Sequence, residues 1–133
     1  MLYSVNGSDS LWRVTPGGAP QPLARVGRVS ALAFGPSEIY LGRPTIWSEI
    51  LRLKTGEREP ELVAKLDCTL SELVLHDREL LATCSTEGRV IAVPTPAGKP
   101  VGVLKRVEYV EQLSVVGEWL FWLRDGRLFR MKR

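Results

Sequence analysis

Four acidic side chains are the residues of this sequence best placed to do chemistry. Asp67 and Glu108 occupy matching positions in two segments of the chain, and Glu72 and Glu111 follow shortly after them. Carboxylate oxygens bind hard divalent cations, and a bound cation can activate water for hydrolysis. Arg28 stands at the matching position of an earlier segment. Polar residues in such positions also serve as solvated lining, and we expect that role here and no bound metal.

Aromatic rings form the second set of candidates, because the chain has four tryptophans in 133 residues. Aromatic faces make large binding platforms. Trp47 lies in an irregular stretch, residues 43–48, that has no counterpart elsewhere in the chain, so it is the best candidate for an exposed ring. Covering a sheet edge is its simpler role. Trp12 and Trp119 align with aliphatic residues of other segments and are expected in the core, whereas Trp122 aligns with Gly42 and Thr83 and is left open.

The two cysteines and the single histidine do not form a recognisable metal or catalytic site. Cys68 and Cys84 have no CxxC spacing and only His76 between them, which is too little for zinc. A hairpin centred on Asp77 would set Cys84 opposite Leu70 and leave Cys68 offset, so we expect both thiols to be reduced. No G-x-S-x-G elbow and no glycine-rich loop leading into a helix are present. The sequence therefore predicts no cofactor.

Charge and hydropathy set the remaining limits on function. Lys and Arg number 18 against 15 Asp and Glu, and a net charge of +3 is weak support for a nucleic-acid partner. The chain lacks an apolar run of the length that spans a membrane, and its first six residues do not resemble a signal peptide. We therefore expect no nucleic-acid and no membrane partner, and a cytoplasmic location if the chain is complete.

An internal repeat of about forty residues organises the whole chain. Pro20, Pro60 and Pro100 recur at this interval, and an apolar run follows each of them. Three further columns of apolar runs recur with the same period. The most regular of these columns contains Leu11–Val14, Ile50–Leu53, Val90–Val93 and Leu128–Met131.

Each repeat unit contains four short apolar runs separated by turn residues, which predicts four β-strands. The spacing of glycine and proline leaves no window for a helix, so the fold is expected to be all-β. The run Trp119–Leu123 is apolar on both faces. That pattern favours sheets packed between two neighbours, as in the blades of a β-propeller. We predict about three and a half four-stranded blades in one domain, residues 1–133. The expected blades are 1–26 (partial), 27–66, 67–107 and 108–133 (partial).

The first unit also resembles a known type of blade. Leu2-Tyr3, Gly7, the run Leu11–Val14, the segment Gly17–Pro20 and the pair Leu23-Ala24 follow the pattern of bacterial propeller repeats. These are similar to the NHL, YWTD and gluconolactonase-like groups. The later units keep the spacing of this pattern, although the YWTD tetrad and the WD dipeptide are absent. The resemblance implies a propeller architecture and, for gluconolactonase-like relatives, a metal in the central channel.

Function is predicted only as a class. The leading expectation is a non-catalytic binding or scaffolding module that contacts a protein or a small molecule, with Arg28, Asp67 and Glu108 at the channel mouth and Trp47 on a loop. A lactonase-like metal-dependent hydrolase and a lectin-like carbohydrate-binding propeller are the alternatives. About three and a half blades form only a half-ring, since closed propellers have about four to eight blades. We therefore expect a homodimer that closes a ring of seven or eight blades. The alternative is a piece of a propeller whose remaining blades lie on a different chain.

Overall fold

The computed structural model describes residues 2–5, 9–95, 98–104 and 109–133. These residues form fourteen strands and no helix, so the described part of the chain has no helix that could cross a membrane. Sheet I contains β1 (Leu2–Val5), β2 (Ser10–Val14) and β3 (Gln21–Arg25). Sheet II contains β4 (Ala31–Phe34), β5 (Glu38–Pro44), β6 (Ser48–Lys54) and β7 (Glu61–Leu66). Sheet III contains β8 (Glu72–His76), β9 (Glu79–Cys84), β10 (Arg89–Pro94) and β11 (Val101–Leu104). Sheet IV contains β12 (Glu111–Val116), β13 (Trp119–Arg124) and β14 (Arg127–Lys132).

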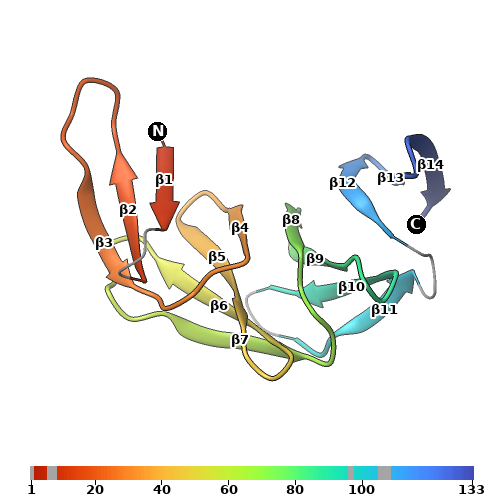
Figure 1. Ribbon diagram of the computed structural model, residues 1–133, viewed down its shortest axis with the longest axis horizontal. Helices are drawn as coiled ribbons and strands as arrows, with labels where there is room; N and C mark the ends of the chain where they lie inside the picture. Colours follow the sequence, from red (N-terminus) through yellow and green to blue (C-terminus); the bar gives the residue numbers. More distant parts are fainter. Residues whose placement is uncertain (1, 6–8, 96–97, 105–108) are drawn as a thin grey trace.

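Each sheet is an antiparallel meander in which strands pair in sequence order. The four sheets follow one another along an arc, with β4, β8 and β12 toward its hollow side (Figure 1). The prediction of an all-β chain built from four-stranded antiparallel sheets is confirmed. Short turns connect the strands because Gly and Asp supply the positive φ that tight hairpins need, as at Asp77 (53°) and Gly117 (58°).

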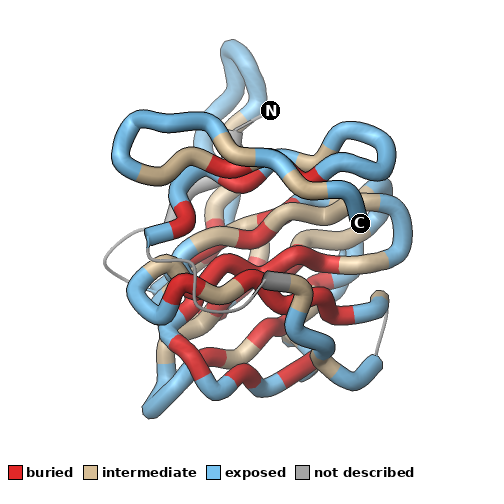
Figure 2. The backbone as a smooth tube through the Cα atoms, turned by 90° about the vertical axis from the view of Figure 1, so that its right-hand side faces the viewer, coloured by how far each residue is buried: buried red, intermediate tan, exposed pale blue. Residues whose placement is uncertain are grey.

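Three apolar clusters lie in the three seams where successive sheets meet. The seam between sheets I and II buries Leu11 against Leu41 and Leu51. The other two seams are built in the same way, one around Tyr40, Ile50 and Leu80 and the other around Val90, Leu113 and Leu120. Figure 2 shows these buried segments crossing the middle of the sheets, with the turns exposed at the margins. The chain therefore has a core between sheets, which explains why its central strands are apolar on both faces.

A β-bulge recurs at the same place in sheets I, II and III, and it aims an apolar side chain into each seam. The register shifts after Leu11, Ile50 and Val90, where the central strand pairs with the outer strand. The extra residues on the outer strands are Leu23, Val63 and Val103, and each packs against a different one of the three clusters. Bulges re-aim side chains and bend the strand. The apolar residues that follow Pro20, Pro60 and Pro100 in the repeat therefore pack into the seams.

The expectation of two reduced cysteines is wrong, because Cys68 and Cys84 form a disulfide with a Cα–Cα distance of 5.9 Å. The hairpin turns at two residues, and Glu72 pairs with Thr83, so its register differs by one from the expected pairing about Asp77. The hairpin contact also continues before β8, where the backbone N–H of Ser71 donates to the carbonyl of Thr83 at 2.8 Å. The pairing expected from the sequence considered only the strands, so it did not cover the segment that carries Cys68.

Trp119 and Trp12 also differ from the expectation that both lie in the core. Val116 pairs with Trp119 across a two-residue turn, as His76 pairs with Glu79. Trp119 therefore corresponds to Glu79, one residue away from the expected alignment with Leu80. As a result Trp122 is buried in the seam between sheets III and IV, whereas Trp119 is 38% exposed on the opposite face. Trp12 alternates with the buried Leu11 and also faces away from the neighbouring sheet.

Reduction of the disulfide is expected to lower the free energy of unfolding by about 2–4 kcal/mol, because the bond closes a loop that restricts the unfolded chain. Urea unfolding with and without dithiothreitol measures this change. The double variant C68A/C84A is the control and should be insensitive to the reductant. Two reactive thiols in the denatured, unreduced protein would contradict the bond.

Candidate functional site

Glu72 holds sheet III to sheet IV at the hollow side of the arc. It begins β8, and its Oε2 accepts a hydrogen bond from the backbone N–H of Leu113 at 3.0 Å. This N–H lies in a register irregularity of β12 between Glu111 and Ser114, where Gln112 has a φ of 48°. A carboxylate that accepts an N–H from an irregular strand compensates for a missing ladder bond. Glu72 therefore has a structural task.

The other predicted site residues that the structure describes lie at the surface. The Oδ1 of Asp67 accepts from Arg89 Nη1 at 2.9 Å on the surface. Arg28 is exposed in the loop between β3 and β4, and Glu111 is exposed at the start of β12. Glu108 lies outside the described residues. Across the part of the chain that the structure describes, no three His, Cys, Asp or Glu side chains gather in a way that could hold a metal ion.

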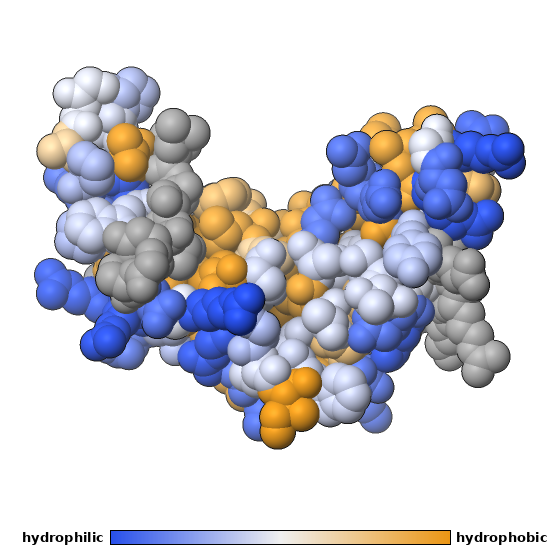
Figure 3. Space-filling view, in the orientation of Figure 1, coloured by the Kyte–Doolittle hydropathy of each residue, from blue (hydrophilic) through white to orange (hydrophobic). Residues whose placement is uncertain are grey.

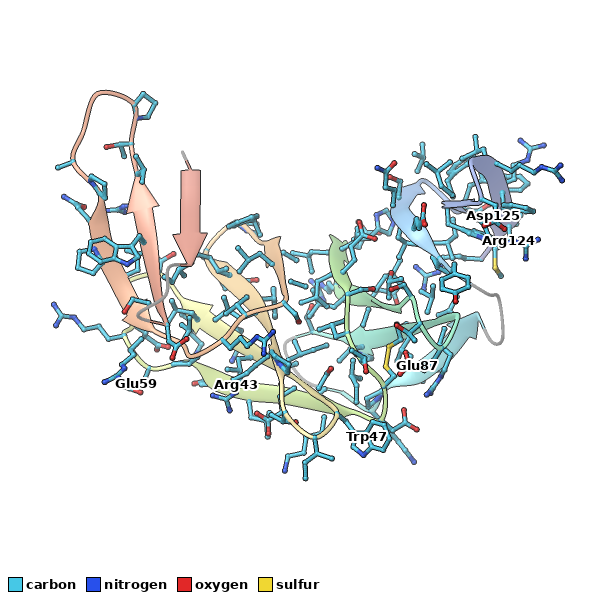
Figure 4. All side chains as sticks on the ribbon, in the orientation of Figure 1. Arg43, Trp47, Glu59, Glu87, Arg124 and Asp125 are labelled. Atoms are coloured by element: carbon cyan, nitrogen blue, oxygen red, sulfur yellow. A yellow bond between two sulfur atoms is a disulfide. The ribbon has the colours of Figure 1, made fainter. Side chains whose placement is uncertain are left out.

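Trp47 lies at the tip of the β5–β6 hairpin, where Pro44 pairs with Ser48. Its side chain is 56% exposed, beside Ile46 at 93%. Figure 4 shows Trp47 on the outer side of the arc, away from its hollow. The hairpin below the tip is braced by an ion pair between Arg43 Nη2 and Glu49 Oε2 at 2.6 Å. The tip thus presents two apolar side chains on a braced support, a feature of protein-binding surfaces.

A polar cleft of about 590 Å³ opens at the seam between sheets II and III, on the side of the β4–β5 and β8–β9 turns. It was not predicted from the sequence. Tyr40, only 1% exposed, contributes its hydroxyl at 3.4 Å from Glu38 Oε1. Beside it, Arg52 Nη2 donates to Glu61 Oε2 at 2.6 Å. The lining residues are Ser37, Glu38, Tyr40, Arg52, Lys54, Thr55, Asp77, Arg78 and Thr95.

The strand register explains why polar groups line this end of the seam. Tyr40 pairs with Arg52 in sheet II, and the equivalent pair in sheet III is Leu81 with Ala92. Two apolar residues that close the next seam are thus replaced here by a phenol and a guanidinium. The repeat contained this signal, because Arg52 stands in the same column as Ala92. A comparison of side-chain polarity at equivalent positions of the repeat would have found the cleft.

Burial and neighbouring groups shift the pKa values of two acidic groups at the cleft, one upward and one downward. Burial, followed by the negative charge of Glu38, raises the pKa of the Tyr40 phenol above its ordinary value. Hydrogen bonds from Arg52 and then Lys54 lower the pKa of the exposed Glu61 carboxyl. Tyr40 is therefore a neutral hydrogen-bonding group over the physiological pH range, and Glu61 is a carboxylate.

Comparison with solved structures places this geometry among known folds. The chain is 13% identical to a chain in "Crystal structure of Nidogen/Laminin Complex" over 90% of its own length, with a TM-score of 0.71. It is 14% identical to the computationally designed Ika8 protein over 98% of its length (TM-score 0.71) and 16% identical to the designed Ika4 protein over 84% (TM-score 0.65). The fold is β-propeller-like. This resemblance shows the fold alone.

The chain spans about half the length of the first solved structures that it matches, 51% of the nidogen/laminin chain and 41% of Ika8. It covers 72% of Ika4. No protein-family model matches the sequence, and no curated protein matches it. The β-propeller-like fold therefore rests on structure, and the candidate residues must be judged by their own contacts.

The raised pKa of Tyr40 predicts a specific loss of stability at alkaline pH. A raised folded-state pKa adds stability that is complete below the unfolded value of about 10 and is lost as the pH rises through the folded value. The free energy of unfolding of the wild type should therefore fall more steeply above about pH 10 than that of Tyr40→Phe. Urea unfolding from pH 8 to 11 measures this difference. Parallel curves for Tyr40→Phe and wild type would disprove the effect.

Proposed function

We propose that this chain is a non-catalytic binding or scaffolding module of the β-propeller type. The contact of Glu72 with the backbone of Leu113 carries this proposal, because it assigns the best-placed inner-strand carboxylate to the architecture. Asp67 is paired with Arg89 at the surface. A hydrolase of the lactonase-like type would need several such oxygens to converge on one cation. Because Glu72 and Asp67 each have a partner within the protein, their contacts favour a binding module.

Ligand binding in this proposal takes place on exposed features. The Ile46–Trp47 tip is the surface best suited to a protein partner, because a protruding indole is a frequent anchor of protein interfaces. A small polar ligand has a second possible site in the cleft around Tyr40 and Arg52. The sheet composition of three, four, four and three strands supports a partial ring that is closed by oligomerisation.

The first test separates the binding module from the hydrolase. Protein treated with EDTA, dialysed and then supplied with Ca²⁺ should carry no stoichiometric metal by elemental analysis and should not hydrolyse a simple lactone above the buffer rate. Glu72→Gln keeps an acceptor oxygen and should unfold nearly as the wild type does. Glu72→Leu should cost about 1–3 kcal/mol because the N–H of Leu113 loses its acceptor. A stoichiometric divalent metal that Glu72→Gln abolishes would refute the proposal.

The second test addresses the lectin-like alternative, which rests on the exposed ring of Trp47. We expect a glycan array probed with folded wild-type protein to give no signal that Trp47→Ala removes. Circular dichroism of both proteins checks the fold, and Ile46→Ala serves as the neighbouring control. Binding to a defined glycan that is lost only in Trp47→Ala would replace our proposal with the lectin-like function.

A further inference from the structure

Sheets I and IV each have one face that no other sheet of the described residues covers. Two different faces meet in every seam inside the chain. The first is the face of a sheet that packs against the next sheet along the chain. The second is the face of that next sheet. We call these the following face and the preceding face. Sheet IV ends the array with an uncovered following face, and sheet I begins it with an uncovered preceding face (Figure 1). The space between these two end sheets is hollow in Figure 3.

The uncovered face of sheet IV carries residues at positions that are buried in the internal sheets. The position of Phe121 in β13 corresponds to Tyr40 and Leu81, which are 1% and 0% exposed. The position of Leu128 in β14 corresponds to Ile50 and Val90, both 0% exposed, yet Leu128 is 68% exposed.

Two further apolar residues, Val116 and Trp119, are 65% and 38% exposed on the same face. The guanidinium carbon Cζ of Arg130 lies over the Trp119 ring, 4.8 Å from the ring centroid. Its equivalent Arg52 instead donates to Glu61 on the outer strand β7, a strand that sheet IV does not have. The uncovered face of sheet IV therefore resembles the faces that form the internal seams, but no sheet of the described residues packs against it.

The uncovered face of sheet I matches the other half of a seam. Trp12 and Val14 in β2 correspond to Leu51 and Leu53 in β6, and these two leucines are each 3% exposed in the seam between sheets I and II. Trp12 and Val14 are only half-buried. The indole Nε1 of Trp12 has no hydrogen-bond partner among the described residues. Two large apolar side chains are thus placed where the preceding sheet would pack.

We propose that a second copy of this chain covers both end faces, with sheet IV of each copy packed on sheet I of the other. This inference rests on the proposed function as a partial-ring module. The two faces fit because the chain already joins the same two types of face in each of its three internal seams. Four sheets in each copy then give a ring of eight sheets. A two-fold axis relates the two new seams, the commonest symmetry of homo-oligomers.

Native mass spectrometry and light scattering of the wild-type chain test this assembly. The expected mass is twice the 14.8 kDa of one chain. A folded monomer would overturn the proposal, and so would a series of growing masses, which would mean that head-to-tail packing stays open. Neither result would affect the metal and lactone assays, so failure of the assembly is distinguishable from failure of the non-catalytic role.

Two charged variants test which faces meet. Leu128→Glu places a carboxylate on the following face of sheet IV, and Val14→Glu places one on the preceding face of sheet I. Each variant alone should be folded by circular dichroism and monomeric by mass. Both copies carry the same substitution, so each variant disrupts both seams of the ring. Ile46→Glu is the matched control at a residue that is 93% exposed on the hairpin tip, and it should remain a dimer.

Mixing the two variants gives the decisive outcome. A heterodimer should form at a ratio of one to one, because Leu128→Glu keeps an intact sheet I and Val14→Glu keeps an intact sheet IV. A dimer that survives Val14→Glu but is lost in Leu128→Glu would show that sheet IV pairs with itself and would overturn the head-to-tail assignment. Failure of the mixture to associate would do the same.

Discussion

Burial of apolar side chains between successive sheets holds the four sheets of this chain together. A meander of three or four short strands has two apolar faces here and cannot shield both of them alone. Each fully buried leucine or isoleucine contributes about 1.5–3 kcal/mol, and every one of the three seams collects several of them. The repeated bulge beside Leu23, Val63 and Val103 adds one more apolar residue to each seam.

Polar groups near the seams are arranged around this constraint. Glu72 supplies the acceptor for the Leu113 N–H across the seam between sheets III and IV. At the preceding seam, the buried Ser48 hydroxyl accepts from the N–H of Leu70 at 2.9 Å. The exception is the cleft beside Tyr40, where the phenol and Arg52 occupy positions that are apolar in the next seam. This departure from the repeat makes the cleft a candidate for binding.

The repeat was strong enough to predict the strands, their antiparallel order and the all-β class, because apolar runs and turn residues recur at a fixed spacing. It was weaker wherever one residue decides the outcome. A two-residue turn at Gly117-Glu118 shifts Trp119 out of the core and brings Trp122 in. The partner of Cys68 depends on the segment before β8, which contacts β9 through the Ser71–Thr83 hydrogen bond, and strand pairing does not describe such segments. The role of Glu72 required knowledge of a local irregularity in β12, which no residue pattern marks.

We infer that the end faces of the array are halves of the same seam that is repeated inside it. A crystal structure of the assembled protein would show which surfaces cover them. We predict two copies related by a two-fold axis, with Trp12 and Val14 of each copy buried against Phe121 and Leu128 of the other. End faces that stay open to solvent, or that are covered by any surface other than these, would contradict it.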